Sequence, residues 1–269
     1  MVSHLAAVGR AALFVCAAPA VVTAAVNDAR AQARFELSYT ISLARISFAE
    51  VTVSAEIGVS EYSMSGDGRI RSLTGAATTS TGSSSVRGIV EGSRLVPTTF
   101  NSKSAFEGEP LDVTVTFEDG NVKEVSASKS KRAGAQLDDA QRRAVLDPLT
   151  ALLIPADLTD AACRRTVRIF DGYQRFDVAL AFKRMGAVKA KEGYAGPAVV
   201  CSGAYKPVGG SRGSATVPGF MMDLLVGREM EITLAPVSGT GVLAPFQTTI
   251  ESMLGNAVAQ ASRFKAVAQ

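Results

Sequence analysis

Apolar and polar residues alternate along most of this chain with a period of two. In residues 35–43, polar residues separate the apolar positions, which are Phe35, Leu37, Tyr39, Ile41 and Leu43. This alternation predicts a β-strand that buries one face. Residues 46–57 repeat the pattern, but its phase slips by one residue around Ala49-Glu50. A β-bulge at that point would return both halves to one face and bend the strand, as a curved sheet requires.

Turn signals divide the following alternating segments into hairpins. Asp119-Gly120 separates residues 113–117 from 122–125, and Asp171-Gly172 separates 166–170 from 174–182. Asp-Gly tolerates the positive φ angles of a type I′ turn, which suits antiparallel strands. Further strands are predicted at residues 198–205, 228–234, 246–252 and 257–267, the last two joined by a Gly255-Asn256 turn. The polar stretch 78–85 is predicted as a strand pair or loop, and 207–213 as a loop.

One segment departs from the period of two. Apolar residues recur at helical spacing from Leu137 to Leu153, which predicts one short helical segment at about residues 137–154. Pro148 would interrupt a single helix, whereas Asp147 is a good N-cap and proline is favoured at the first helical position. Two short helices meeting at Asp147-Pro148 are therefore an alternative. The predicted fold is mainly β: a single curved antiparallel sheet, barrel or half-barrel, with this segment covering an opening.

The N-terminus has the features of an export signal. Arg10 precedes an alanine-rich apolar stretch, and the small-residue motif Ala31-Gln32-Ala33 precedes Arg34. We therefore expect residues 1–33 to be cleaved between Ala33 and Arg34, leaving residues 34–269 as a single exported β-rich domain. Cleavage after Ala24 or Ala25, and retention of the segment as an anchor, stay open. After cleavage no stretch is apolar and long enough to cross a membrane as a helix, so we do not expect an integral membrane protein.

Cleavage changes the chemical inventory of the chain. The sole histidine, His4, is removed, and the formal net charge falls from +3 to +2 because two basic residues and one acidic residue are lost. A nearly neutral chain does not indicate nucleic acid as a partner. The absence of histidine excludes most hydrolase triads and many metal sites. We expect no catalytic, metal-binding or cofactor-binding residues, and no enzyme activity.

Two short matches to catalytic motifs lack the required context. Residues 209–213 match G-x-S-x-G, but they lie in a glycine-rich segment, and the motif needs a strand-to-helix turn and a histidine. Residues 126–129 match S-x-x-K, but the companion motifs are missing and the segment is predicted as a strand end. We interpret both as chance matches.

Two cysteines, Cys163 and Cys201, remain after cleavage. An even number of cysteines in an oxidising compartment predicts a disulfide between them. They lack the C-x-x-C spacing of a redox pair, and a zinc site would require additional ligands. We therefore expect a structural disulfide.

Three motifs together resemble an exported bacterial family called domain of unknown function 3108. The first is the segment Leu146-Asp147-Pro148-Leu149-Thr150-Ala151-Leu152-Leu153. The second is Cys163 followed by residues 168–177, and the third is Cys201 ahead of residues 205–207. The resemblance implies a β-rich periplasmic protein of a Gram-negative bacterium. It implies no reaction, ligand or catalytic residue.

The motif residues also have structural explanations. Asp147 and Pro148 suit a helix start, and Asp171 and Gly172 suit a hairpin turn. The pair Arg175 and Asp177 lies two residues apart on a predicted strand, so both side chains share one face. They could line a cavity or meet solvent, and the solvent-exposed arrangement is favoured.

These observations favour a noncatalytic periplasmic envelope protein. A curved sheet with an apolar inner face offers a pocket for a lipid or another amphipathic envelope component. A scaffolding or interaction protein of an envelope complex is the first alternative. A carboxylate-dependent hydrolase of envelope glycan or peptide is the second, although no carboxylate pair stands out in the sequence.

Overall fold

Alternating apolar residues produce long strands throughout the molecule. The computed structural model describes residues 33–71, 80–106, 109–128, 137–210 and 227–267. The strands are β1 (Ala33–Leu43), β2 (Ile46–Ile57), β3 (Glu61–Ile70), β4 (Ser80–Glu91), β5 (Arg94–Phe106), β6 (Glu109–Glu118), β7 (Asn121–Ala127), β8 (Ile154–Pro155), β9 (Arg165–Phe170), β10 (Gln174–Lys189), β11 (Glu192–Gly193), β12 (Ala195–Gly210), β13 (Glu229–Val237), β14 (Val242–Ile250) and β15 (Ala257–Val267). Two 3₁₀ turns, η1 (Thr150–Leu152) and η2 (Asp160–Cys163), are the helical elements among the described residues.

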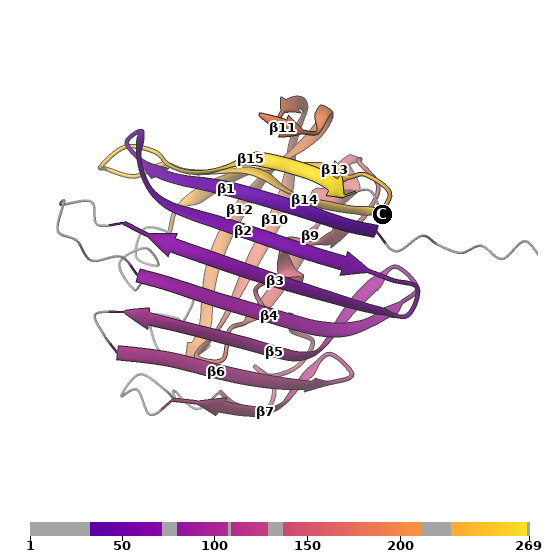
Figure 1. The fold of residues 1–269 in the computed structure, drawn as a ribbon, viewed down its shortest axis with the longest axis vertical. Helices are drawn as coiled ribbons and strands as arrows, with labels where there is room; N and C mark the ends of the chain where they lie inside the picture. The colour runs from indigo at the N-terminus through magenta and orange to yellow at the C-terminus, as the bar shows by residue number, and fades with distance from the viewer. Residues whose placement is uncertain (1–32, 72–79, 107–108, 129–136, 211–226, 268–269) are drawn as a thin grey trace, which may run out of the picture.

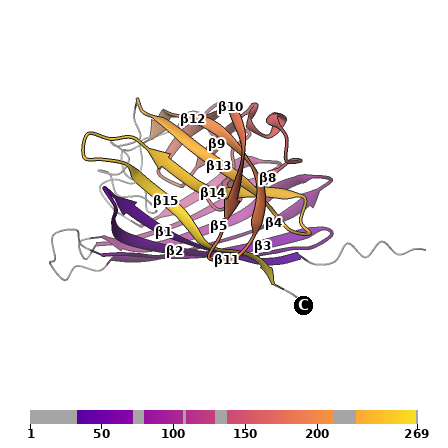
Figure 2. The ribbon, with the colours of Figure 1, turned by 90° about the horizontal axis from the view of Figure 1, so that it is seen from above.

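All of these strands belong to one sheet. Their order is β7-β6-β5-β4-β3-β2-β1-β15-β14-β13-β12-β10-β9, with antiparallel pairing along this path. The short strands β11 and β8 pair beside it, with β15 and β14 respectively. In Figure 1, β1–β7 form a front layer, and β9, β10 and β12 cross behind it. Figure 2 shows the sheet turning from one layer into the other through β1, β15 and β14. The prediction of a single curved antiparallel sheet is confirmed.

The sheet stays open between its two end strands, β7 and β9, and a segment without regular structure is hydrogen-bonded to both of them. On the β7 side, the Val122 amide donates to the Arg142 carbonyl (2.9 Å), and the Val145 amide donates to the Gly120 carbonyl (3.0 Å). On the β9 side, Leu146 exchanges backbone hydrogen bonds with Arg168 and Phe170, both 2.9 Å. We call residues 142–146 the bridging segment. It satisfies edge groups that would otherwise be available for aggregation.

The predicted bulge and one predicted turn are correct. In β2, Ala49 pairs with Ile41 while Ser47 pairs with Ser42, so Phe48 is the additional residue, next to the predicted position. Both Phe48 and Ala49 are buried, as expected for a bulge that keeps two side chains on one face. Asp119 (φ 52°) and Gly120 (φ 74°) have the positive angles of the predicted type I′ turn.

Other local predictions need correction. At Asp171-Gly172 only the glycine has positive φ (94°), and the strands pair again at Phe170 and Arg175, so four residues form the turn. The predicted loop 207–213 is strand β12 as far as Gly210, and residues 211–213 lie outside the described part. The stretch 78–85 enters β4 at Ser80, and residues 78–79 are likewise outside. The predicted 252–257 connection is a turn in which Gly255, and not Asn256, has positive φ (106°).

The predicted helical segment at about 137–154 is wrong for most of its length. Only η1 is helical within it, and residues 139–144 form turns and bends, with Ala144 at positive φ (50°). Hydrogen bonds to the edges of β7 and β9 replace the i→i+4 bonds of a helix, so tertiary pairing overrides the local apolar spacing. A second 3₁₀ turn, η2, follows at a place where no helix was predicted.

Side chains of this chain fill the space against the inner face of β1–β7. Phe35, Leu37, Phe100 and Val115 are fully buried there. The segment after the bridge packs on the same face: Leu149 and Leu153 belong to this core cluster, and a Leu149 methyl group lies 3.0 Å from where a Cβ on Gly66 would stand. The absence of a side chain at Gly66 is therefore what allows the motif segment to lie against β3.

A second core cluster lies against β10, β12, β13 and β14, and the chain from β8 to η2 packs on it. Its members include Leu180, Cys201, Ile232 and Leu243 from the strands, together with Ile154 and Ala162 from the covering segment. The disulfide Cys163–Cys201 joins η2 to β12 within this cluster, with 5.4 Å between the Cα atoms. The predicted pairing is present in the structure.

Candidate functional site

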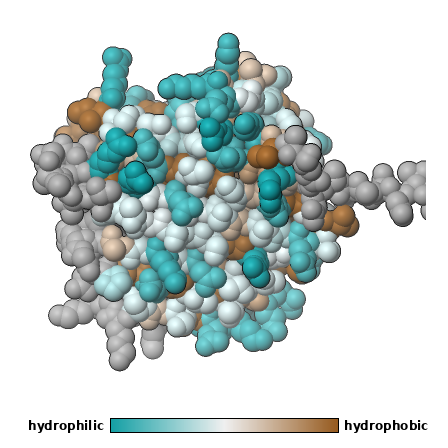
Figure 3. Space-filling view, viewed as in Figure 1, coloured by the Kyte–Doolittle hydropathy of each residue, from teal (hydrophilic) through white to brown (hydrophobic). Residues whose placement is uncertain are grey.

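The outer face of β1–β5 is polar and is built from cross-strand rows. Residues that alternate with the buried ones point outward, and the strand register aligns them. The central row is Ser54, Ser65, Ser85 and Asn101, on four successive strands. These side chains are short, so the middle of the face is low. In Figure 3, the middle of this face is mostly pale, and hydrophilic residues lie among and around the pale ones.

Two shallow grooves lie on this face, the first lined in part by the central row and the second by residues that include a neighbouring row. The first has a volume of about 790 Å³, and its polar lining includes Arg34, Glu56, Arg87 and the central serines. The second, about 610 Å³, is lined by polar residues that include Thr52, Asp67, Ser83 and Lys103. Neither groove has an aromatic side chain pointing outward from its strands.

Charges of both signs border the grooves. Arg34 forms an ion pair with Glu56. Arg87, Asp67 and Lys103 form no ion pair with another described residue. Exposed charges of mixed sign, spaced along a polar surface, are suited to complementary charges on a partner. Among the described residues no cluster of three metal-ligating side chains exists.

The family motif around Asp147 forms the most buried polar site of the molecule. The Asp147 Oδ1 accepts hydrogen bonds from the Leu149 amide (2.9 Å) and the Thr150 amide (3.1 Å). The predicted N-cap position needs correction, because Leu149 and not Asp147 directly precedes the three-residue 3₁₀ turn η1, and the Asp147 carboxyl group instead fixes the turn that leads into η1. The Thr150 hydroxyl is 2.7 Å from the Tyr62 hydroxyl of β3. The motif is tied to the front layer by this contact.

Burial controls the acidity of this site. Asp147 is 0% exposed, and its Oδ2 has no hydrogen-bond partner. Desolvation raises the pKa of Asp147 to about 6, partly opposed by the backbone amides that donate to it. Burial and the nearby Asp147 charge also raise the pKa of Tyr62. No groove or exposed surface reaches this carboxyl group, so we assign it a structural role.

Asp171 and Gly172 also have structural roles. The Asp171 Oδ1 accepts from the Tyr173 and Gln174 amides, both 2.9 Å, and so fixes the turn between β9 and β10. A Cβ on Gly172 would lie 2.2 Å from a methyl group of Val113 in β6. The turn therefore packs directly on the front layer, and glycine is required by both its φ angle and the lack of space.

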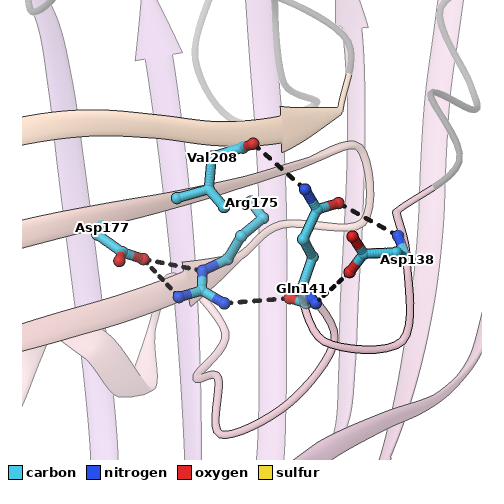
Figure 4. A network of polar contacts seen from close by, with 5 residues as sticks. All are labelled: Asp138, Gln141, Arg175, Asp177 and Val208. Carbon is cyan, nitrogen blue, oxygen red and sulfur yellow. Dashed lines mark hydrogen bonds and ion pairs between the residues drawn. The ribbon is translucent and has the colours of Figure 1, made fainter.

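Arg175 is buried and takes part in a network of polar contacts, which Figure 4 shows. Its side chain is 6% exposed and bonds the Asp177 Oδ1 through Nε (2.9 Å) and Nη2 (2.5 Å). Its Nη1 donates to the Gln141 carbonyl (3.1 Å). The Gln141 side chain accepts from the Asp138 backbone amide through Oε1 and donates to the Val208 carbonyl through Nε2, and the Gln141 backbone amide donates to the Asp138 Oδ1. The sequence favoured solvent exposure for Arg175, and this prediction is wrong because the side chain is buried. Arg175 instead links β10 to the residues before the bridging segment.

Some sequence predictions concern residues that lie wholly or partly outside the described ranges. Residues 1–32, including His4 and the proposed signal, lie outside the described residues, and β1 begins at Ala33. Cleavage before Arg34 stays a prediction. Residues 126–127 end β7, as expected, and Lys129 lies outside the described part. No described helix is long and apolar enough to span a bilayer.

Sequence reasoning missed the outer face. Its signal is present in the alternating serine, threonine and glycine positions of residues 61–70 and 80–88, where the polar side of each strand carries short side chains. Without the strand register, those positions could not be assembled into one surface. The burial of Asp147 and Arg175 was missed because charged residues are seldom fully buried.

Comparison with known proteins places the chain in a family without a known function. No functionally curated protein matches it. One similar solved structure is described as a beta-barrel-like protein of domain of unknown function DUF1849 from Brucella abortus. The match has 10% sequence identity and a TM-score of 0.48, and it covers 88% of this chain and 99% of that chain. The family model described as "Protein of unknown function (DUF3108)" matches residues 35–261, and the chain therefore belongs to this family.

Proposed function

We propose that this protein is a noncatalytic interaction protein of the bacterial cell envelope, exported to the periplasm, whose outer face on β1–β5 binds an envelope protein. The observation that supports this proposal most is the contrast between the two faces of the front layer. The inner face is covered by the chain's own side chains, whereas the outer face has two open polar grooves. Binding energy is available only where surface is still exposed.

The chemistry of the outer face favours a protein partner. A nucleic acid or another uniformly anionic polymer would meet Asp67 as well as Arg87 and Lys103. A folded protein can instead match both signs of charge and hydrogen-bond to the short hydroxyl side chains. Short side chains also lose little conformational entropy on binding, so they form a suitable contact surface.

An amphipathic ligand inside the sheet is the function that the sequence favoured, with an interaction protein as its first alternative. Such a ligand needs exposed apolar surface in a cavity. Phe35, Phe100 and Phe246 are at most 2% exposed, because Leu149, Leu153 and their neighbours pack against the same cluster. A lipid would have to displace this packing. The filled core therefore favours the interaction protein over the lipid carrier.

Site-specific photocrosslinking in the living cell tests the proposal. A photoreactive phenylalanine derivative is placed at Ser65 in the centre of the outer face, and, as a control, at Ala181, which is exposed on β10. We expect one discrete protein adduct from position 65 and none from position 181. Ser85→Arg, which places a large side chain beside Ser65, should abolish the adduct, whereas Ala181→Arg should leave it. No adduct at position 65, or equal adducts at both positions, would refute the proposal.

A further inference from the structure

Two hairpin turns at one end of the sheet carry three of the most exposed large apolar side chains among the described residues. Met253 is 93% exposed and Leu254 is 69% exposed, both between β14 and β15. Ile46, which is 62% exposed, begins β2 directly after the β1–β2 turn. We call these three residues the apolar tip. Figures 1 and 2 show the two hairpins ending side by side, and Figure 3 shows hydrophobic atoms at the corresponding upper left edge.

The two turns form one unit because they are bonded to each other. The Ala44 amide donates to the Asn256 carbonyl (3.0 Å). A Cβ on Gly255 would lie 3.0 Å from the Ala44 Cβ, so the turns are in direct contact. Ile46, Met253 and Leu254 therefore project from one protrusion and not from separate loops.

Several backbone groups of the longer turn form hydrogen bonds within the turn. The Ser252 hydroxyl accepts from the Leu254 amide (3.2 Å) and donates to the Gly255 carbonyl (2.6 Å). The Gly255 amide donates to the Ser252 carbonyl (3.0 Å). A turn that enters hydrocarbon must satisfy its polar groups without water, because each unpaired group is costly there. These internal bonds lower that cost for the Leu254 and Gly255 amides and for the Ser252 and Gly255 carbonyls, while the Met253 and Leu254 side chains stay exposed.

The shorter turn supplies a positive charge and shows backbone strain. Ala44 (φ 48°) and Arg45 (φ 71°) occupy the left-handed region, where Asn-Gly would be preferred. Strain that is retained at an exposed turn is an indication of function. Arg45 is exposed directly before Ile46, so a cation adjoins the apolar tip. Apolar side chains next to a basic residue are the pattern of a surface that inserts into a membrane interface.

We infer that the apolar tip formed by Ile46, Met253 and Leu254 inserts into the interfacial region of a phospholipid bilayer, with Arg45 beside the headgroups. A protruding turn has no groove of its own to receive a partner's side chain, whereas a fluid bilayer adapts to it. The tip lies on hairpin ends and not on the outer face of β1–β5, so this inference is independent of the proposed protein partner.

The chain offers a matched control for testing this contact. Val59, on the turn between β2 and β3, is 62% exposed, as Ile46 is, but it lies at the opposite end of β2. The sequence contains no tryptophan, so each introduced tryptophan is a unique fluorophore. Leu254→Trp and Val59→Trp in the full mature chain therefore report separately on the two ends of the sheet.

The experiment adds vesicles of phosphatidylethanolamine and phosphatidylglycerol to each protein. We expect a blue shift of the Leu254→Trp emission and none for Val59→Trp. In vesicle sedimentation, the double change Met253→Ser and Leu254→Ser should weaken partitioning by at least tenfold, and Arg45→Gln by about fivefold. Val59→Ser should match the unchanged protein. Thermal melts identify any variant that has not folded.

Three outcomes would overturn the inference. The first is no vesicle-dependent shift at position 254, and the second is an equal shift at positions 254 and 59. The third concerns sedimentation equilibrium without vesicles. If Met253→Ser with Leu254→Ser abolishes self-association and leaves vesicle binding unchanged, the tip is an interface between copies of the chain.

Discussion

At the scale of single residues, the polar groups of the family motifs act as buried connections between layers. Asp147 fixes η1 and contributes to the environment of Tyr62, and Asp171 fixes the turn that rests on Val113. Buried carboxylates of this kind are costly unless they are hydrogen-bonded. One oxygen of Asp147 has no hydrogen-bond partner. The free-energy cost of burying this carboxyl group therefore depends on whether it is ionised, and so on pH.

The raised pKa of Asp147 predicts a specific pH dependence of stability. Its pKa is about 6 in the folded protein and 3.8 when unperturbed. The folded state therefore binds the proton more tightly, and the associated stability is present below pH 4 and lost as pH rises through 6. The full difference is about 3 kcal/mol. Asp147→Asn should remove this dependence.

Urea unfolding of both proteins at pH 4.5 and 7.5 measures the effect. The free energy of unfolding of the unchanged protein, relative to Asp147→Asn, should fall by about 2 kcal/mol over this interval, most of the full difference. A difference between the two proteins that does not change with pH would contradict the assignment of a desolvated carboxyl group.

Gly172 provides a second prediction, with a control inside the chain. Gly172→Ala should lower the free energy of unfolding by about 3 kcal/mol or more, because it combines positive φ with a clash against Val113. Gly92 also has positive φ (62°) but nothing lies within 4 Å of a Cβ there, so Gly92→Ala should cost only about 1 kcal/mol. Chemical denaturation measures both values.

A double-mutant cycle separates the clash from the backbone strain. Val113→Ala removes the obstructing methyl groups, so Gly172→Ala should cost less in that background than alone. Equal costs in both backgrounds would show that the turn does not rest on β6.

At the scale of secondary-structure elements, the bridging segment replaces a strand. Its hydrogen bonds join β7 to β9 without forming a regular ladder. The amides of Val145 and Leu146 should therefore exchange with deuterium as slowly as those of Val122 and Phe170. Residues 139–140, on the exposed turn before the bridge, should exchange fast. Fast exchange at 145–146 would mean that the sheet edges are not connected.

The disulfide links two elements that are 38 residues apart in the chain. Closing a loop of this length stabilises the folded state by about 4 kcal/mol through the entropy of the unfolded chain. Replacing Cys163 and Cys201 together with alanine should lower the free energy of unfolding by about this amount. Guanidinium titration of the oxidised protein and the double variant measures it, and a loss below 1 kcal/mol would contradict the role of the disulfide as a staple.

Strands were easier to predict than the connections between them. The alternation at Phe35–Leu43 and the phase slip near Phe48 contain enough local information to predict a strand and its bend. The segment 137–149 does not, because its apolar spacing suits a helix, while the backbone bonds of residues 142, 145 and 146 go to residues far away in sequence. Long-range pairing of this kind has no local signal.

At the scale of the whole molecule, the sequence predicted the curved sheet, but it did not predict which face of the sheet is open to a binding partner. Alternation shows that each strand has a dry side, but not whether that side encloses a cavity or packs on the chain's own segments. Leu149 and Leu153 belong to the core cluster, which shows that the dry side packs on the chain's own segments. The outer grooves and the apolar tip depend on which strands and turns are neighbours, and that information exists only in the register.

Native mass spectrometry of the protein purified from periplasm, followed by lipid extraction, tests most directly whether the interior is filled. If the interior is filled by the chain's own side chains, we expect the mass of the mature chain with one disulfide and without a retained lipid. The extract should contain no lipid in stoichiometric amount, because the membrane contact of the tip is reversible. One lipid per chain, released only on denaturation, would contradict a filled interior.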